Sequence, residues 1–326
     1  MDKVRVAFIG AGGHARGVHY PSLVEMEDVE IAAVCELSPE RLKAAQETYH
    51  IARGYTDYKK MVEEVAPDAV YLIAPPHHMV EPAIGLLNMK QNLFIEKPPG
   101  VCTEQTRNLA RLAEKNGCLT MVGFNRRFIP VLVQARNLVE ERSPISQCTA
   151  LFMKHHLGGG PYYGGVVDIL TCDAIHAVDT LRWLGGEVLM LSSCVDRFFE
   201  DYPNAFNALM RFREGGVGLL ICNWAAGKRV HTFEIHGYGI SAFVDPDTFG
   251  AHIFKDNEEA PLTITAEQAA GSAARHRTYG FFGENRHFID CIREKRQPDT
   301  HLADAVKTME LVDRIYRCTF PSVGTR

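Results

Sequence analysis

The chain has 326 residues, a length that favours two domains. Hydrophobic residues make up 46% and charged residues 23%, which suits a globular core. The formal net charge is −5 and no run of Lys and Arg occurs, so the basic surface that nucleic-acid binding requires is not expected. No stretch reaches the roughly 18 consecutive apolar residues of a membrane span, and the nine scattered cysteines include no CxxC pair. We therefore expect a cytoplasmic protein with reduced cysteines that binds neither nucleic acid nor membrane.

The first third of the chain alternates short apolar runs with segments of helical spacing. Such runs are typical of parallel strands that are buried on both faces. Ser38 and Pro39 open one helical segment as N-cap and first helical residue, and Thr103 and Gly117 are the predicted start and stop of another. The apolar runs lie at residues 4–9, 30–36, 68–74, 92–98 and 118–124. This alternation predicts an α/β Rossmann domain with a doubly wound parallel sheet over residues 1–124.

The rhythm changes after about residue 125. One linking helix is expected at residues 130–141, and alternating strands with little helix between them follow. Glu214-Gly215-Gly216 is the predicted turn of a hairpin. Two closing helices are expected at residues 278–295 and 302–317. Residues 125–326 are therefore predicted to form an α+β domain with an open, mainly antiparallel sheet.

A glycine-rich turn follows the first apolar run. Gly10-Ala11-Gly12-Gly13-His14-Ala15 fits the pattern GxGxx(G/A) between a strand and a helix. Gly10 permits the tight turn, Gly12 lets the backbone approach a pyrophosphate, and Ala15 keeps the helix close to the strand. The N–H groups and partial positive charge of the helix N-terminus then face the phosphates. The context predicts a dinucleotide site, against the alternative of a plain glycine turn.

An acidic residue at the end of the second run indicates which dinucleotide is bound. Glu36 lies 26 residues after Gly10, where a carboxylate can accept hydrogen bonds from both ribose hydroxyls of NAD and repel a 2′-phosphate. NAD is therefore the expected cofactor. NADP stays open, because Arg41 or Arg53 could fold over a phosphate. The alternative for Glu36 is a capping role.

Three further motifs follow predicted strands or open a helix. They are Ala74-Pro75-Pro76-His77-His78, Glu96-Lys97-Pro98 and Gly123-Phe124-Asn125-Arg126-Arg127-Phe128. The segment from Gly164 to Gly186 contains His176 and Asp179. With the glycine turn, these motifs closely resemble the Gfo/Idh/MocA family, named after glucose–fructose oxidoreductase and inositol 2-dehydrogenase. The resemblance covers nearly the whole chain, and Glu-Lys-Pro is its most specific part.

The resemblance implies an NAD(P)-dependent oxidoreductase. Family members transfer a hydride between a nicotinamide and a hydroxyl or keto carbon of a sugar, an inositol or a related small molecule. Residues 1–124 would bind the dinucleotide, with contacts from Pro75, Pro76, His78, Glu96 and Lys97. Residues 125–326 would bind the substrate and supply the open sheet face of a homodimer or homotetramer. Two alternatives stay open, a non-catalytic dinucleotide-dependent sensor or regulator and an NAD-dependent glycosidase.

Lys97 and His176 are the expected catalytic residues. The family places Lys97 beside the nicotinamide, where its ammonium could stabilise alkoxide-like charge on the reacting oxygen. Glu96 would orient Lys97 or contact the cofactor, and in many relatives the peptide before Pro98 is cis. His176 suits an acid–base role because its reference pKa lies near neutrality. The alternatives are a surface lysine and a core or capping histidine.

The aspartate of the family pattern is displaced in this chain. Many relatives carry Asp four residues before the histidine, where this sequence has Cys172. Asp173 lies three residues before His176, still within one helical turn. Three roles stay open for it: to tune His176, to bind a substrate hydroxyl, or neither. Asp168 is a second candidate. Loss of the relay acid would leave proton transfer to Lys97 and His176 alone.

Other polar residues are expected at the substrate. Asn125 and Arg127 follow the run at 118–124 and are predicted to bind substrate or cofactor, with turn capping and a surface charge as alternatives. Tyr163, or its neighbour Tyr162, lies in a glycine-rich loop and could stack on a sugar ring. No metal site is expected, because the adjacent His155 and His156 would point to opposite faces of a strand.

Overall fold

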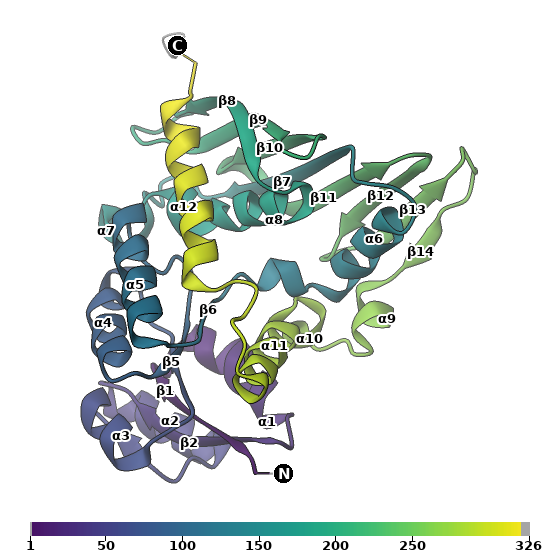
Figure 1. Cartoon of the computed structure of the whole chain (residues 1–326). Helices are drawn as coiled ribbons and strands as arrows, with labels where there is room; N and C mark the ends of the chain where they lie inside the picture. The colour runs from purple at the N-terminus through teal and green to yellow at the C-terminus, as the bar shows by residue number, and fades with distance from the viewer. Residues whose placement is uncertain (1, 321–326) are drawn as a thin grey trace. The chain divides into compact units, whose positions relative to one another are not determined.

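The computed structural model describes residues 2–320, which divide into two compact units (Figure 1). Of the described residues, the first unit comprises 2–125 with Arg275–Lys307, and the second comprises Arg126–Ala274 with 308–320. The predicted boundary after residue 124 therefore lies beside the division between Asn125 and Arg126. The structure also places Arg275–Lys307 in the first unit, although these residues follow the whole second sheet in the chain.

The first unit contains a six-stranded parallel sheet. Its strand order is β3-β2-β1-β4-β5-β6, so the direction of winding reverses between β1 and β4. The strands are β1 (Val4–Ile9), β2 (Val29–Cys35), β3 (Gly54–Tyr55), β4 (Ala69–Leu72), β5 (Asn92–Ile95) and β6 (Thr120–Val122). This is the doubly wound order in which ligands bind at the switch point between the two halves. The predicted Rossmann fold is confirmed; the two-residue strand β3 was not predicted.

Helices connect these parallel strands, as right-handed crossovers require. Ser38 caps α2 as predicted, since its hydroxyl accepts a hydrogen bond from the Arg41 N–H at 3.3 Å. Helix α5 ends at Gly117 (φ 68°), but its N-cap is Cys102, so Thr103 is the first helical residue and not the cap. The helical segments are η1 (Ala15–His19), α1 (Tyr20–Val24), α2 (Pro39–Tyr49), α3 (Tyr58–Val65), η2 (Pro76–His78), α4 (Val80–Asn88), α5 (Thr103–Asn116), α10 (Arg275–Thr278) and α11 (Phe281–Glu294).

Stacked aromatic rings pack at the end of β1 and contact the glycine turn. The Phe8 ring stacks on Tyr20 at 4.2 Å and on Tyr71 at 4.8 Å between centroids. Tyr71 in turn stacks on Phe94 at 4.8 Å. The Tyr20 hydroxyl donates a hydrogen bond to the carbonyl of Gly10 at 3.3 Å. Because aromatic stacks of this kind are rigid and fully buried, they hold the end of β1 in one position.

The second unit contains an eight-stranded sheet in the order β14-β13-β12-β11-β7-β10-β9-β8. All neighbouring strands are antiparallel except β7 and β10, which are parallel. The predicted turn at Glu214-Gly215-Gly216 joins β9 and β10 as a hairpin. The strands are β7 (Gln147–His155), β8 (Val188–Asp196), β9 (Ala205–Phe212), β10 (Val217–Asn223), β11 (Ala225–Gly237), β12 (Ile240–Asp245), β13 (Gly250–Lys255) and β14 (Leu262–Ile264). The predicted mainly antiparallel sheet is confirmed.

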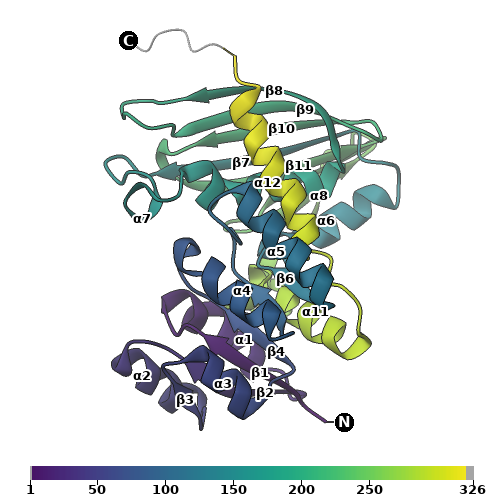
Figure 2. The same ribbon diagram turned by 60° about the vertical axis from the view of Figure 1, so that its left-hand side comes forward.

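Two helices cover one face of this sheet. Helix α8 packs against β7 and β10, and α6 packs against β11 and β12 (Figure 2). The strands alternate buried and more exposed residues, and Leu189, Met190 and Leu209 are 49%, 67% and 54% exposed. The remaining helical segments are α6 (Pro130–Glu140), α7 (Tyr162–Gly165), η4 (Leu170–Ala174), α8 (Ile175–Gly185) and α9 (Ala266–Ala270), with η3 (Asn125–Phe128) and α12 (Leu302–Arg317), which both begin in the first unit. Among residues 2–320, no helix has the length and apolar character of a membrane span.

His231 is a buried histidine in the core of the second unit. Its ring stacks on Phe152 at 4.0 Å and lies 4.7 Å from the Phe233 ring. Within the described part of the chain, neither ring nitrogen has a hydrogen-bond partner. Burial, with Arg126, Arg229 and Lys154 nearby, lowers the pKa of His231 well below its ordinary value. The ring is therefore neutral in the fold and takes up a proton on unfolding below about pH 6.5.

Replacement of His231 by phenylalanine is expected to stabilise the protein. Removal of two unsatisfied buried nitrogens should raise the free energy of unfolding by about 1–3 kcal/mol at pH 8. Because the folded-state pKa is lowered, wild-type stability is present above about pH 6.5 and falls on acidification. The advantage of H231F should then widen by about 1.4 kcal/mol per pH unit below that value. Urea unfolding at pH 8 and at pH 5.5 measures both effects; an advantage that does not change with pH would refute the assignment.

Candidate functional site

The glycine turn after β1 is closed on one side and open on the other. Gly10 has φ 104°, and a Cβ there would lie 2.1 Å from the Ile73 carbonyl oxygen, so only glycine fits. At Gly12 and Gly13 an added Cβ would meet no atom within 4 Å. Helix η1 starts two residues later, at Ala15. The turn therefore leaves room for a phosphate group at the start of a helix, as dinucleotide binding requires.

A cavity of about 600 Å³ borders this turn. It lies at the carboxyl ends of β1, β2 and β4, the edge at which open α/β sheets bind ligands. The residues that line it are Ile9, Gly10, Gly12, Cys35, Glu36, Leu37, Arg41, Thr56, Tyr58, Leu72, Ile73, Ala74, Pro75, His78, Glu81 and Pro82. Five residues predicted to bind the cofactor are thus brought together here: Gly10, Gly12, Glu36, Pro75 and His78. Pro76 is buried, and neither it nor Gly13 or Ala15 lines the cavity.

Glu36 presents an ionised carboxylate on the wall of the cavity. It accepts hydrogen bonds from the N–H groups of Ala11 at 2.9 Å and Ser38 at 3.0 Å, and from the Arg41 guanidinium at 2.8 Å. Burial opposes ionisation, but the bonds from Arg41, Ser38 and Ala11 outweigh it and hold the pKa of Glu36 below its ordinary value. The carboxylate therefore stays charged at neutral pH and would repel a 2′-phosphate.

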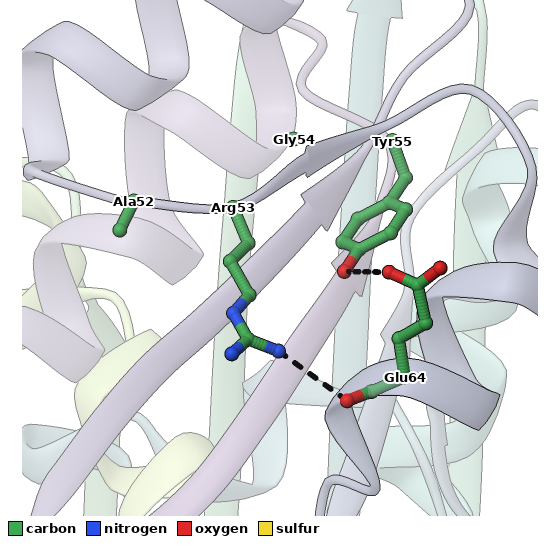
Figure 3. Close-up of a pocket in the computed structure, with 5 residues that line it drawn as sticks. All are labelled: Ala52, Arg53, Gly54, Tyr55 and Glu64. Atoms are coloured by element: carbon green, nitrogen blue, oxygen red, sulfur yellow. Dashed lines mark hydrogen bonds between the residues drawn. The ribbon is translucent and has the colours of Figure 1, made fainter.

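Arg41 and Arg53 were the two arginines that could bind the 2′-phosphate of NADP, and only one of them lines this cavity. Arg41 does so, beside Glu36. Arg53 instead lines a separate hollow of about 610 Å³ with Ala52, Gly54, Tyr55 and Glu64 (Figure 3). There its guanidinium donates to the Glu64 main-chain oxygen at 3.3 Å, and the Tyr55 hydroxyl donates to the Glu64 carboxylate at 3.0 Å. Of these two arginines, Arg41 is therefore the one placed to contact a ribose, or a phosphate on it, in this cavity.

Glu96 connects two histidines to the main chain of Lys97. Its Oε1 atom accepts hydrogen bonds from the Nε2 atoms of His14 and His19, both at 2.9 Å. Its Oε2 atom accepts the Lys97 N–H at 3.0 Å, and the peptide between Lys97 and Pro98 is cis. Burial opposes its ionisation, but His14 and His19 together hold the pKa of Glu96 well below its ordinary value. Glu96 thus fixes the backbone of the predicted catalytic lysine.

Asp173 lies at the centre of a polar network in the second unit. Its Oδ2 atom accepts hydrogen bonds from the Lys154 ammonium and from the Tyr162 hydroxyl, the latter at 2.5 Å. The Trp224 indole N–H donates to the same hydroxyl at 3.3 Å. Burial, with Asp173 beside it, raises the pKa of Tyr162 above its ordinary value, so the phenol stays protonated. Lys154 was not among the residues predicted for the site. The sequence signal that could have indicated it is a lysine next to the last residue of an amphipathic strand.

The displaced aspartate coincides with a change in helix geometry. Leu170–Ala174 form a π-helical segment, η4, and α8 starts at Ile175. A π turn holds one more residue than an α turn and is often found at functional sites. Cys172 and Asp173 both lie in this segment and are buried, and His176 follows in α8, 5% exposed. Tyr163, in contrast, is 46% exposed, and its neighbour Tyr162 contacts Asp173.

Asn125 and Arg127 are both engaged by buried protein groups. The Asn125 amide donates to the Tyr279 carbonyl at 2.8 Å. The Arg127 guanidinium makes two parallel hydrogen bonds to Asp179, at 2.8 and 2.6 Å. Thr308 donates a further hydrogen bond to Asp179 at 2.8 Å. These contacts give both residues a structural function beside the substrate contacts predicted for them.

The strand order, the glycine turn and the ionised Glu36 define a Rossmann dinucleotide-binding protein. Residues 4–124 match the family model Gfo/Idh/MocA, described as an oxidoreductase family with an NAD-binding Rossmann fold. The match covers the first sheet and its helices, and it is to the family that the motifs of this chain resemble.

Curated relatives extend the similarity beyond the first sheet. The chain is 26% identical to D-glucoside 3-dehydrogenase of Escherichia coli, over 82% of this chain and 83% of the relative. It is 25% identical to the rhizopine catabolism protein MocA of Rhizobium meliloti, over 85% and 90%. Inositol 2-dehydrogenase of Salmonella typhimurium is 27% identical over about half of each chain, 49% and 48%.

Solved structures share the fold of both units over nearly all of the chain. A dehydrogenase from Chromobacterium violaceum has a TM-score of 0.88 at 20% identity, covering 98% of this chain and 96% of its own. A levoglucosan dehydrogenase in complex with NADH and levoglucosan has a TM-score of 0.86 at 18% identity, covering 97% of each chain. Both folds agree with the two sheets described above.

Proposed function

We propose that this chain is an NAD-dependent dehydrogenase that transfers a hydride between the nicotinamide and a hydroxyl or keto carbon of a sugar, an inositol or a related small molecule. The observation that carries the proposal is the cavity at Gly10 and Gly12, with the ionised Glu36 on its wall. The substrate class is supported by the relatives named D-glucoside 3-dehydrogenase and inositol 2-dehydrogenase. Residues 1–124 would bind the dinucleotide and residues 125–326 the substrate.

Lys97 would act on the oxygen of the reacting carbon. Bound NAD supplies the hydride acceptor. The Lys97 ammonium stabilises negative charge as it develops on the substrate oxygen, and Glu96 holds the lysine backbone in place through the 3.0 Å hydrogen bond. A fixed backbone at Lys97 limits the positions that its ammonium can take, which favours a productive orientation toward the substrate.

His176 and Asp173 would move and control the proton. The imidazole of His176 takes the hydroxyl proton in oxidation and returns it in reduction. Asp173 is held by Lys154 and Tyr162, so its carboxylate has a fixed orientation for a substrate hydroxyl or for the histidine. Asn125, Arg127 and Tyr163 complete the proposed substrate contacts, with Arg127 and Asn125 acting from buried, hydrogen-bonded positions.

A homodimer or homotetramer is proposed through the open face of the second sheet. Leu189, Met190 and Leu209 are large apolar side chains that are about half or more exposed on β8 and β9. An apolar surface of this kind is a usual site of subunit contact. Light scattering on the eluted protein should give two or four times the chain mass of 36.4 kDa; a single chain mass would refute the proposal.

The exchange of Glu36 for glutamine is expected to lower the preference for NAD. Loss of a charge-assisted hydrogen bond costs about 1.5–3 kcal/mol, so KM for NAD should rise roughly 10- to 100-fold. KM for NADP should fall or stay level, because the repulsion of the 2′-phosphate is removed. Glu47→Gln, an exposed change on helix α2, which follows Glu36 in the chain, is the matched control. An unchanged ratio of the two KM values would show that Glu36 does not select the cofactor.

Dinucleotide reduction tests the proposed activity. The protein is mixed with NAD and a panel of sugars, inositols and linear polyols, and the near-ultraviolet absorbance of the reduced nicotinamide is followed. Turnover of at least one of these compounds is expected. Tight NAD binding without reduction across the panel would refute the dehydrogenase and favour a dinucleotide-dependent sensor.

A further inference from the structure

We propose that His14, His19 and Glu96 form a binding site for a divalent transition-metal ion, with zinc the ion that best suits their chemistry. One ligand atom of each residue lies within 4.8 Å of the other two. Two imidazole nitrogens and one carboxylate oxygen make up a ligand set that zinc uses in proteins, with the fourth position left for water or another ligand. The site goes beyond the proposed dehydrogenase activity and does not depend on it.

The distances within the cluster are close to those of a coordinated ion. Both histidine Nε2 atoms lie 2.9 Å from the same Glu96 oxygen. With zinc–ligand bonds of about 2.0–2.2 Å, neighbouring ligand atoms of a tetrahedral site lie roughly 3.3 Å apart. An outward movement of about 0.4 Å therefore gives each of the two contacts with Glu96 the spacing of a coordination site, and the two histidine nitrogens lie within 4.8 Å of each other. Side-chain rotation alone supplies a movement of that size.

The groups around the cluster meet the further requirements of a metal site. Ligating histidines are usually oriented through their second ring nitrogen. Here His19 Nδ1 lies 3.2 Å from the Asn285 amide nitrogen and 3.5 Å from its oxygen. The other Glu96 oxygen is held by the Lys97 N–H. Two of the three ligands are thus oriented before an ion binds.

The protonation states of His19 and Glu96 are also compatible with a bound metal ion. Burial lowers the pKa of His19, which keeps its ring neutral, and Glu96 is ionised. In the hydrogen-bonded state the neutral imidazole of His19 carries its proton on Nε2. When the metal binds Nε2 of His19, this proton moves to Nδ1, and the Asn285 amide can accept it in place of donating to Nδ1. His19 therefore loses no net proton on coordination.

His14 provides access to the cluster. Its side chain is 48% exposed, whereas those of His19 and Glu96 are 0% and 7% exposed. An ion can therefore enter from the side of His14, and water can occupy the open position. The absence of a metal site was predicted from His155 and His156, which are neighbours in the chain. The present three ligands come instead from the glycine turn, helix η1 and the end of β5.

Zinc titration by calorimetry tests the site without any measurement of activity. The parent for these titrations is the 326-residue chain with Cys102→Ser, Cys194→Ser and Cys318→Ser introduced, because exposed thiols also bind zinc. One ion per chain is expected. The exposed change His14→Ala should weaken binding by at least about tenfold, since loss of an outer-shell partner alone costs that much. His50→Asn removes another exposed histidine and should leave binding unchanged.

Cobalt provides a second readout. Co²⁺ in place of zinc should give the visible absorption of a four-coordinate ion, and this absorption should disappear in H14A. No bound ion in the parent protein, or equal binding by the parent and H14A, would overturn the proposal. Thermal unfolding of H14A in the absence of metal shows whether the variant is folded. NAD binding is titrated separately, so a failed metal site is distinguished from a failed dinucleotide site.

Discussion

Lys97→Ala is expected to lower kcat by about 10²–10³-fold, because a preorganised charge at the reacting oxygen contributes roughly 3–4 kcal/mol to transition-state stabilisation. The cavity that is proposed to hold the dinucleotide does not include Lys97 among its lining residues. The dissociation constant for NAD should therefore change far less than kcat. Steady-state kinetics with the substrate identified from the panel, and fluorescence titration with NAD, measure the two effects.

A matched control shows whether the effect is specific to Lys97 or follows from the removal of any lysine. Lys115, exposed on α5, replaced by alanine should leave both kcat and NAD binding unchanged. Lys97→Arg tests geometry, because a guanidinium keeps the charge but not the compact ammonium. Partial activity in K97R would support electrostatic stabilisation. Full activity in K97A would remove Lys97 from the chemistry, whatever the binding of NAD.

Arg127→Ala is expected to destabilise the protein by about 3–5 kcal/mol, because Asp179 is left as an uncompensated buried charge. Asp179 is fully buried, and its carboxylate is bound by two hydrogen bonds from Arg127 and one from Thr308. Only the hydrogen bond from Thr308 would remain. Urea unfolding followed by circular dichroism gives the change in the free energy of unfolding.

A double variant distinguishes an uncompensated charge from lost packing. Arg127→Met with Asp179→Val removes both charges with little change in total side-chain volume, and it should recover most of the stability lost in R127A. Equal loss in the single and double variants would show that packing around Arg127, and not the charge of Asp179, controls stability. A loss below about 1 kcal/mol in R127A would show that the pair behaves like a surface ion pair.

Local patterns in the sequence were sufficient to predict the fold. Five of the six parallel strands were predicted, because they are buried on both faces and read as apolar runs. The strand Gly54–Tyr55 was missed since two residues carry no periodicity. The predicted cap Thr103 was wrong by one position: Cys102 has the extended backbone of an N-cap but offers no side-chain hydrogen bond. The N-cap preferences of amino acids alone therefore do not locate the first residue of helix α5.

The cofactor cavity could be predicted because its parts are local or follow from strand order. A glycine turn follows one strand, an acid ends the next, and parallel topology brings the carboxyl ends of strands to one edge. The contact of Glu96 with His14 and His19 joins residues 82 and 77 positions apart. Helix geometry places His14 and His19 near each other, but their distance from Glu96 depends on tertiary packing.

The network around Asp173 could not be derived from spacing. Lys154 contacts Asp173 from strand β7 and Tyr162 contacts it from the short helix α7. The π-helical segment that carries Asp173 has no recognisable sequence signal. Arg127 shows a related limit. From the sequence alone, a charged residue after a strand can face solvent, bind substrate or pair with a buried group. Arg127 is buried because Asp179 lies within hydrogen-bond distance of it, and the sequence does not show this contact.

Transfer of deuterium from substrate to nicotinamide tests the central claim most directly. A polyol or sugar from the active panel is labelled with deuterium at the oxidised carbon, and the reduced dinucleotide formed by the wild-type protein is isolated and weighed by mass spectrometry. Direct hydride transfer predicts one deuterium in each reduced dinucleotide. Reduced dinucleotide without deuterium, or no reduction at all with NAD bound, would contradict the account.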